Sequence, residues 1–563
     1  MVSFRLPTCL RLIAASGIAI GLCLFAPQGA SAQTRLATPT DFGTSPAPMG
    51  GSSKDPCGFY KPYGYIGADD ITFSAVVSGP ATVSLSAEFL IVPSNGSAPL
   101  DLTVAAVSGS PAEVVVPEAD FTNGVTYAWR VRATDSDGDV SPYTQTCHFI
   151  SDQTIPPEPT VSSATFNSTT TPVAGTAGTF TFSVSGPDVS AVTGFDYTLN
   201  NPATGAPSGF AAISADGTAT TAAIRPTVPG VNTITVDTVD HAGNISQPVT
   251  YSFDLSTPPP AADADMNGDG IPDLLTVGDT AGLAPGLWQA TGKAKPSVAA
   301  ETGRLKTPAT NIGINGAGLG APSTPSEFDG ADVITGQFFA QGFNDVLVYF
   351  PSGNSAGGGV ILHGTGNGAA LPAGDENVNI PIGSLADANG DNPLQVVNAY
   401  TSLYDTGFPD LLAVNGDPVN GYYLDYYEDG FAPGIFTNTF SIQTPTPDGT
   451  EDWNDWTLAT LSYSGGVGMF LWNEGTGALY LWTGVTFTDN GNGTGSIAYT
   501  QYELSSDWNT GQPLTTLEAA DFGGRGVPDL WAVTPSGIAT AYVVSNLANG
   551  TGTITAGKPQ NLT

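Results

Sequence analysis

Alternating apolar and polar positions recur along most of this chain and predict short β-strands. Between residues 82 and 92, apolar side chains occupy every second position: Val83, Leu85, Ala87, Phe89 and Ile91. A second run places one set of apolar side chains opposite Arg130 and Arg132: Tyr127, Trp129, Val131 and Ala133. A period of two residues is typical of a half-buried antiparallel strand. No 3.6-residue apolar period is sustained beyond the N-terminus, so the pattern predicts an all-β fold.

The alternation resumes after a stiff, proline-rich linker at residues 155–159. Three further runs carry it, at Phe180–Val184, Phe195–Leu199 and Val231–Val239. We therefore predict two β-sandwich domains, at residues 57–152 and 160–256. The segment Tyr127–Asp135, followed by Ser141-Pro142-Tyr143, resembles the late strands of fibronectin type III and immunoglobulin-like domains. Residues 239–246 resemble the matching hairpin of bacterial immunoglobulin-like domains.

From residue 263 to residue 563, the chain repeats a unit made of a strand, a glycine-rich loop and another strand. The aligned loop positions are 265, 337, 402, 460 and 521, so the units follow one another at similar intervals. A period of about 60 residues, filled with short strands, indicates a propeller-type array in which each unit buries its faces against its neighbours. Five units are visible, and a further, degenerate unit within residues 280–336 remains open.

The first loop, Asp265-Met266-Asn267-Gly268-Asp269-Gly270-Ile271-Pro272-Asp273, has oxygen-bearing side chains at positions 1, 3, 5 and 9. Ca²⁺ takes roughly 6–8 oxygen ligands, several of them from carboxylates. We expect four side chains and one backbone carbonyl to bind Ca²⁺ here: Asp265, Asn267, Asp269 and Asp273, with the carbonyl of Ile271. An EF-hand would have Glu at position 12, where this chain has Thr276. The alternative is a turn rich in Asp, Asn and Gly that binds no metal.

The loop and its strands resemble the FG-GAP (VCBS-type) repeat, the blade unit of integrin-α-like β-propellers, and the resemblance covers residues 263–563. It implies a calcium-binding β-propeller, but the calcium motif is complete only in the first copy. Other residues stand at ligand positions in three later copies: Gln337 and Gln341, Ser402 and Thr406, and Gly523 and Arg525. We expect these loops to keep the turn without the metal, with Arg525 placing a cation where the ion would bind. The copy at position 460 keeps only its strands.

Taken together, the sandwiches and repeats resemble the non-catalytic part of large secreted actinobacterial proteins. A laminin-G/concanavalin-like domain often follows the repeats in those proteins, and this chain stops at Thr563, about where such a domain would begin. The resemblance thus leaves the expected ligand-binding module absent.

Residues 1–32 have the features of a secretory signal peptide. Arg5 and Arg11 precede an apolar core, and Ala30-Ser31-Ala32 forms a cleavage site. We expect residues 33–56, which are rich in Pro, Gly, Ser and Thr, to be a flexible lead. Cleavage leaves two cysteines, and we expect Cys57 and Cys147 to form a disulfide in an oxidising compartment. No other stretch is long and apolar enough to span a bilayer.

The acidic composition excludes some partners. The 12 Lys and Arg that remain after cleavage, against 51 Asp and Glu, give the mature chain a formal charge of −39. Such a chain repels nucleic acids and anionic membranes. We expect a secreted monomer that binds cations.

Adjacent tyrosines suggest a binding role. Tyr422, Tyr423, Tyr426 and Tyr427 lie beside acidic residues, and aromatic rings beside carboxylates can stack on sugars. We therefore expect a non-enzymatic recognition or adhesion protein for an extracellular glycan or protein. A polysaccharide-directed hydrolase with an unrecognised carboxylate pair is the alternative. The motif Gly353-Asn-Ser355-Ala-Gly357, followed by His363, lacks the strand–turn–helix context of a nucleophile elbow.

Overall fold

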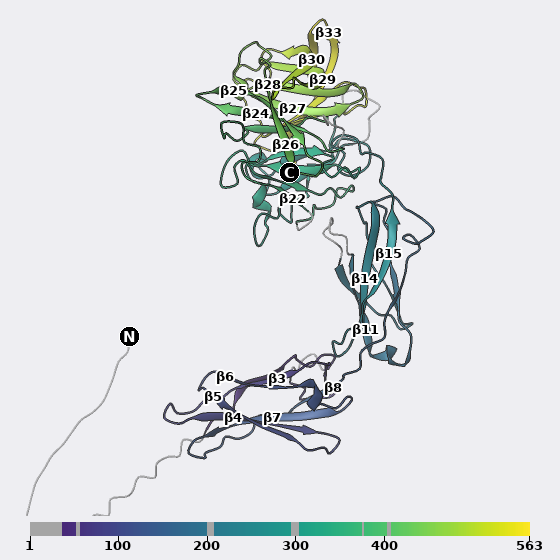
Figure 1. The fold of residues 1–563 in the computed structure, drawn as a ribbon, viewed down its shortest axis with the longest axis vertical. Helices are drawn as coiled ribbons and strands as arrows, with labels where there is room; N and C mark the ends of the chain where they lie inside the picture. The colour runs from purple at the N-terminus through teal and green to yellow at the C-terminus, as the bar shows by residue number, and fades with distance from the viewer. Residues whose placement is uncertain (1–35, 52–56, 200–207, 294–302, 374–376, 402–406) are drawn as a thin grey trace, which may run out of the picture. The chain divides into compact units, whose positions relative to one another are not determined.

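The computed structural model describes residues 36–51, 57–199, 208–293, 303–373, 377–401 and 407–563. Within these residues the regular structure is almost entirely β, as the alternation predicts, with only short 3₁₀ turns besides the strands (Figure 1). The chain divides into two compact units, residues 1–154 and residues 155–563. The predicted signal peptide lies outside the described residues.

The first unit is a sandwich of two sheets (Figure 1). One sheet has the order β1 (Thr40–Ser45), β3 (Ile71–Val76) and β6 (Pro111–Val116). The other has the order β2 (Tyr65–Ile66), β8 (Cys147–Ser151), β7 (Thr126–Asp135), β4 (Leu85–Pro93) and β5 (Leu100–Ala106). The two alternating runs are β4 and β7, which pair antiparallel. Their apolar faces are buried around Trp129 and Phe73, which confirms the predicted facing of both strands.

β1 corrects the prediction of a flexible lead. Thr40–Ser45 pairs with β3, and Leu36 is buried in the core of the sandwich. The low apolar content of residues 33–56 concealed this strand, because an edge strand with few buried side chains leaves little alternation in the sequence. The sandwich therefore begins before residue 57.

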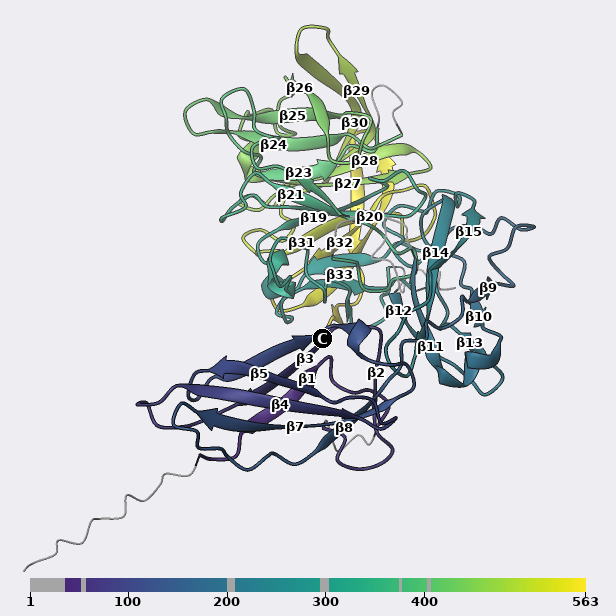
Figure 2. The same cartoon turned by 60° about the horizontal axis from the view of Figure 1, so that its bottom comes forward.

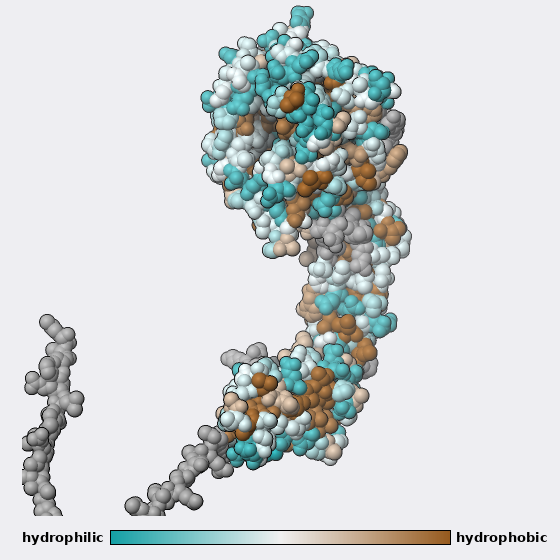
Figure 3. Space-filling model, turned by 60° about the vertical axis from the view of Figure 1, so that its left-hand side comes forward, coloured by the Kyte–Doolittle hydropathy of each residue, from teal (hydrophilic) through white to brown (hydrophobic). Residues whose placement is uncertain are grey.

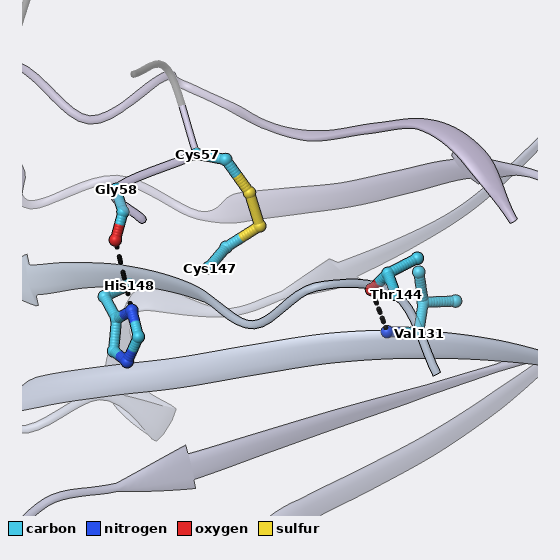
Figure 4. Close-up of a disulfide and its surroundings, with 6 residues drawn as sticks. All are labelled: Cys57, Gly58, Val131, Thr144, Cys147 and His148. Atoms are coloured by element: carbon cyan, nitrogen blue, oxygen red, sulfur yellow. Dashed lines mark hydrogen bonds between the residues drawn. A yellow bond between two sulfur atoms is a disulfide. The ribbon is translucent and has the colours of Figure 1, made fainter. Parts of the chain in front are cut away.

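The Cys57–Cys147 disulfide is present, with the two Cα atoms 4.9 Å apart (Figure 4). Cys147 is the first residue of β8, and Cys57 precedes β2. Backbone contacts support the junction, because His148 donates its N–H to the Cys57 carbonyl at 2.9 Å. The bridge closes a segment of 90 residues, for which the chain-entropy model gives about 4–5 kcal/mol of stabilisation.

The second sandwich also has two sheets (Figure 2). Their orders are β13 (Thr218–Thr220), β10 (Thr181–Ser183) and β9 (Thr160–Ser162), and β12 (Ser208–Ala212), β11 (Val192–Leu199), β14 (Gly230–Asp240) and β15 (Val249–Leu255). Each sandwich contains a hairpin turn with the same pattern of hydrogen bonds. Asp135 and Asp240 each accept two backbone N–H groups with Oδ1, and Ser141 and Ser246 each accept a strand N–H with Oγ. The acids of 135–139 thus belong to a hairpin turn.

Five successive groups of antiparallel strands follow, called the first to fifth sheets below, and hydrogen bonds between parallel strands join the last three into one 13-stranded sheet. The first is β16 (Leu274–Val277), β17 (Leu287–Ala290) and β18 (Thr310–Asn311). The second is β19 (Asp332–Gly336), β20 (Asp345–Tyr349), β21 (Gly359–Leu362) and β22 (Val378–Ile380). The third is β23 (Gln395–Asn398), β24 (Leu411–Asp417), β25 (Gly421–Asp429) and β26 (Phe436–Ile442). The fourth is β27 (Trp456–Tyr463), β28 (Gly466–Asn473), β29 (Leu479–Asp489) and β30 (Thr494–Ser505). The fifth is β31 (Thr516–Ala520), β32 (Asp529–Val533), β33 (Ile538–Ala548) and β34 (Thr551–Ala556), with β35 (Gln560–Asn561) beside β33.

The first strands of the five sheets are neighbours, in the order β16, β19, β23, β27, β31 and again β16. Side chains join several of them. Gln395 exchanges two hydrogen bonds with the backbone of Leu458, at 2.9 and 3.0 Å, and Glu518 accepts the N–H of Leu275 at 2.9 Å. All five strands line one cavity of about 410 Å³.

Candidate metal site

The predicted calcium loop connects Ala264 to β16. Gly268 and Gly270 adopt φ angles of 75° and 78°, the left-handed region that glycine reaches without strain. Asp265 organises the turn. Its Oδ1 accepts the N–H groups of Asn267, Gly268 and Asp269 at 3.2, 2.8 and 3.2 Å, and its Oδ2 accepts that of Gly270 at 2.8 Å. The sequence folds into this loop because one carboxylate satisfies four consecutive donors.

Asp273 ends the loop and is fully buried. Its Oδ1 accepts the N–H of Gly292 at 2.8 Å, and its Oδ2 accepts the side-chain amide of Gln289 at 2.6 Å. The amide of Asn267 donates to both oxygens, at 3.0 and 2.9 Å. Burial raises the pKa of Asp273 to about 6, although these hydrogen bonds act in the opposite direction. The groups that donate to this buried carboxyl from the described part of the chain are electrically neutral.

The two remaining predicted ligands lie at the rim of the loop. Asp269 accepts the N–H of Ile271 at 3.1 Å, and the Nζ of Lys306 lies 3.7 Å from its Oδ2. Within the described part of the chain, no group of three or more His, Cys, Asp or Glu side chains is placed to hold a metal ion.

The residues fit a hard cation by chemistry and by burial. Three carboxyl groups, one amide oxygen and one carbonyl within a single short loop match the oxygen ligands of Ca²⁺. Asp273 is a buried acid whose described partners carry no charge, and burying such an acid is costly unless a positive charge compensates it. To act as a ligand, Asn267 would have to turn its amide oxygen, instead of its nitrogen, toward Asp273.

The ninth loop position has a structural role that sequence reasoning missed. Asp345, Asp410 and Asp529 occupy it in later copies, and all are buried. Like Asp273, each of these acids accepts a backbone N–H from the second strand after its loop or from one of the residues that follow that strand. The donors are Gly364, Asp429 and Val544, at 2.8, 2.8 and 3.0 Å. The signal was available, because this acid persists in copies that have lost the other ligands. It ties the loop to the sheet whether or not a metal binds.

The last copy carries a cation of its own. Asp521 accepts the N–H groups of Arg525 and Gly526 at 3.0 and 2.9 Å, so the turn resembles the first loop. The Arg525 guanidinium lies 2.6 and 2.9 Å from the two oxygens of Asp529. We expected Arg525 to place a cation at the position of the ion, and its nitrogen does contact the ninth-position carboxylate.

The second copy has become a packing loop. Phe343 belongs to the buried core cluster of the second sandwich. Gln341 bonds to Nε2 of His363 at 3.0 Å, and Gln337 donates to the carbonyl of Ala261 at 3.2 Å. The predicted substitutions Ser402 and Thr406 of the third copy lie outside the described residues.

Two of the four tyrosines correct the expectation of sugar stacking. Tyr426 and Tyr427 are buried in β25. Tyr426 stacks on Phe487 at 3.8 Å between ring centroids and donates to Asp410 at 2.5 Å. Tyr427 donates to the carbonyl of Leu385 at 2.6 Å. Neighbours on a strand face opposite sides, but both sides of this strand are covered by other sheets.

The serine motif forms a hairpin turn. Ser355 lies between β20 and β21, whereas His363 directly follows β21. The strand alone separates them by roughly 13 Å. His363 instead contacts Gln341 and the carbonyl of Gly364, both at 3.0 Å. This serine and this histidine are not paired.

Comparisons with known proteins identify no family. No family model and no curated protein matches the chain. Among solved structures, the FN1–FN3 domains of chicken CNTN1 match at 16% identity and a TM-score of 0.27, over 39% of this chain and 69% of that one. The fibronectin(III)-like modules of Clostridium thermocellum CbhA match at 16% identity and 0.25, over 35% and 92%. A Ca²⁺-stabilized adhesin with which an Antarctic bacterium binds ice matches at 13% identity and 0.21, over 94% and 99%. These scores are too low to support an argument from similarity.

Among the described residues, no helix has the length and apolar character needed to cross a membrane.

Proposed function

We propose that this chain is a secreted, non-enzymatic recognition protein for an extracellular glycan or protein surface. In this proposal, residues 263–563 form a five-bladed, FG-GAP-like β-propeller that one Ca²⁺ ion stabilises. The two preceding sandwiches are immunoglobulin-like or fibronectin III-like modules that carry it.

The observation that carries the proposal is the succession of first strands around one cavity. Five sheets with neighbouring first strands are what a propeller requires. The first sheet has only three described strands. Its first described strand, β16, follows the ninth-position acid, as the second strands β20, β24 and β32 do, so a counterpart of β19, β23, β27 and β31 is not among the described strands of this sheet. A rigid array of this kind presents loops for binding. The visible face of this array carries hydrophilic and near-neutral residues, with several hydrophobic patches among them (Figure 3).

The calcium part rests on the first loop. The described partners of its buried ninth-position acid are neutral, while the acid of the last copy is paired with Arg525. The predicted signal peptide and the disulfide support an oxidising, extracellular location.

The test is a glycan array and a polysaccharide pull-down with residues 33–563, in Ca²⁺ and in chelator, with analysis of the products. Retention without cleavage supports recognition. Cleavage of a bound polymer would overturn the non-enzymatic assignment, and no retention of any polymer would contradict the glycan target.

A further inference from the structure

The cavity between the five first strands has the size of a small-ligand site. Its volume of about 410 Å³ falls in the range of roughly 300–1,000 Å³ that ligand pockets occupy. Residues at the start of four strands line one end: Ala331, Leu394, Trp456 and Leu514. Near the end of β27, Asp263 accepts the N–H of Ser462 at 3.0 Å, so the segment that precedes the first sheet lies beside this end of the strand.

The lining is acidic and polar. Asp332, Glu474 and Glu518 contribute carboxyl groups, and none of the described residues that line the cavity is Lys, Arg or His. Trp456 and Trp472 are also among the lining residues. An anionic ligand would be repelled by this lining, whereas a hydrogen-bond donor or a cation would be attracted.

Two carboxyl oxygens of residues that line the cavity have no partner among the described protein groups. Glu518 uses Oε2 to accept the N–H of Leu275, and Asp332 accepts the N–H of Val396. Glu518 Oε1 and Asp332 Oδ2 are buried and accept no hydrogen bond from the part of the chain that the structure describes. Buried polar atoms are nearly always satisfied, so an unsatisfied pair on residues that line a cavity points to a donor from outside the chain, toward which each carboxyl has to turn because neither oxygen has accessible surface as the chain lies. Burial raises the pKa of Asp332 to about 7, which a bound cation would reverse.

We propose that this cavity binds a sugar-sized ligand rich in hydrogen-bond donors and without negative charge, preferably an amino sugar, with Asp332 and Glu518 as its acceptors. An ammonium group donates to carboxylates with charge-assisted bonds, and hydroxyl groups donate to the same oxygens more weakly. The inference deepens the proposed function and rests on glycan recognition.

The test uses residues 33–563, titrated with three disaccharides and followed by tryptophan fluorescence and calorimetry. The glucosamine disaccharide should bind about tenfold more tightly than cellobiose, because one charge-assisted bond contributes about 1.4 kcal/mol or more. Digalacturonate should not bind. Equal binding of all three, or binding of none, would overturn the proposal without any variant.

Two isosteric variants locate the site. Glu518→Gln and Asp332→Asn keep an oxygen for the N–H of Leu275 and Val396, and each should weaken binding of the glucosamine disaccharide about tenfold. Glu503→Gln, at an exposed position of β30, is the matched control and should change nothing. If wild type and Glu518→Gln retain a polymer equally and bind the disaccharide with the same affinity, the cavity is not the binding site. That result would leave the proposed glycan recognition unchanged. If the wild-type protein retains no polymer, the proposed function is contradicted. The disaccharide titration would still show whether the cavity binds an amino sugar.

Discussion

The first and last loops of the repeat array share a backbone and differ in their charge. Asp265 and Asp521 both accept loop N–H groups, and Asp273 and Asp529 are both buried and bonded to a later strand. Asp529 has a guanidinium on both oxygens, whereas the donors to Asp273 from the described residues are neutral. The difference teaches that the loop fold and the metal are separable. In the proposed account, the turn needs the first and ninth acids, and the cation at its centre comes from the chain in the last loop and from solution in the first.

The largest expected effect concerns the first loop. Asp269→Ala should lower stability in Ca²⁺, because it removes a ligand while leaving the turn bonds of Asp265 intact. At a concentration of 100 times the dissociation constant, a bound ion stabilises by about 2.7 kcal/mol, and the variant should lose most of this. Urea unfolding followed by tryptophan fluorescence reports on this region, where seven of the eight tryptophans lie. Equal losses in Ca²⁺ and in chelator would instead indicate a metal-free turn.

A somewhat smaller effect should follow from Asp529→Ala in the last loop. The variant leaves the N–H of Val544 and the Arg525 guanidinium without their acceptor. An unsatisfied buried donor costs about 1–3 kcal/mol, so we expect a loss of about 2 kcal/mol in the same urea assay. The loss of stability should be the same with and without Ca²⁺. A calcium-dependent loss would show that the last loop also binds Ca²⁺, and that Arg525 does not replace the ion there.

The sequence predicted the strands and their facing because burial on one side of a sheet leaves a period of two. It also predicted the disulfide and the cation of Arg525. It could not show that Tyr426 and Tyr427 are buried, because coverage of both faces depends on neighbouring sheets. It did not reveal Asp332 and Glu518 as cavity residues, because β19 and β31 are distant in the sequence and only the fold brings them to one wall. Thr40–Ser45 was missed because the edge strand carries little apolar alternation.

A third prediction concerns the pH dependence of stability that the buried carboxyl group of Asp345 causes. Burial raises the pKa of Asp345 to about 7, against about 3.9 in an unfolded chain. The folded state therefore binds the proton more tightly, so stability in chelator should rise as pH falls. Between pH 8 and pH 6, this group should add about 1 kcal/mol.

Asp345→Asn should flatten the corresponding part of the pH profile, measured as urea midpoints at each pH. Any uniform loss of stability from the substitution is a separate readout. An unchanged slope in the variant would show that Asp345 does not titrate in this range.

The smallest effect is expected for a charged neighbour of the first loop. Lys306 lies 3.7 Å from Asp269, and their side chains are 58% and 33% exposed. An exposed pair of this kind contributes about 0–1 kcal/mol, so Lys306→Ala should change the urea midpoint in chelator very little. A large loss in chelator would mean that Lys306 is the cation of the first loop, as Arg525 is of the last.

The most direct measurement is the number of Ca²⁺ ions bound, by calorimetric titration of chelator-treated protein. Three chains are compared: wild type, Asp269→Ala, and the double variant Gly523→Asn with Arg525→Asp. The double variant gives the last loop the pattern of the first, and Gly524 and Gly526 already have the required φ angles of 54° and 69°. We predict that Asp269→Ala loses one site and that the double variant gains one. A wild-type chain that binds no Ca²⁺, or a stoichiometry that neither change affects, would contradict the account.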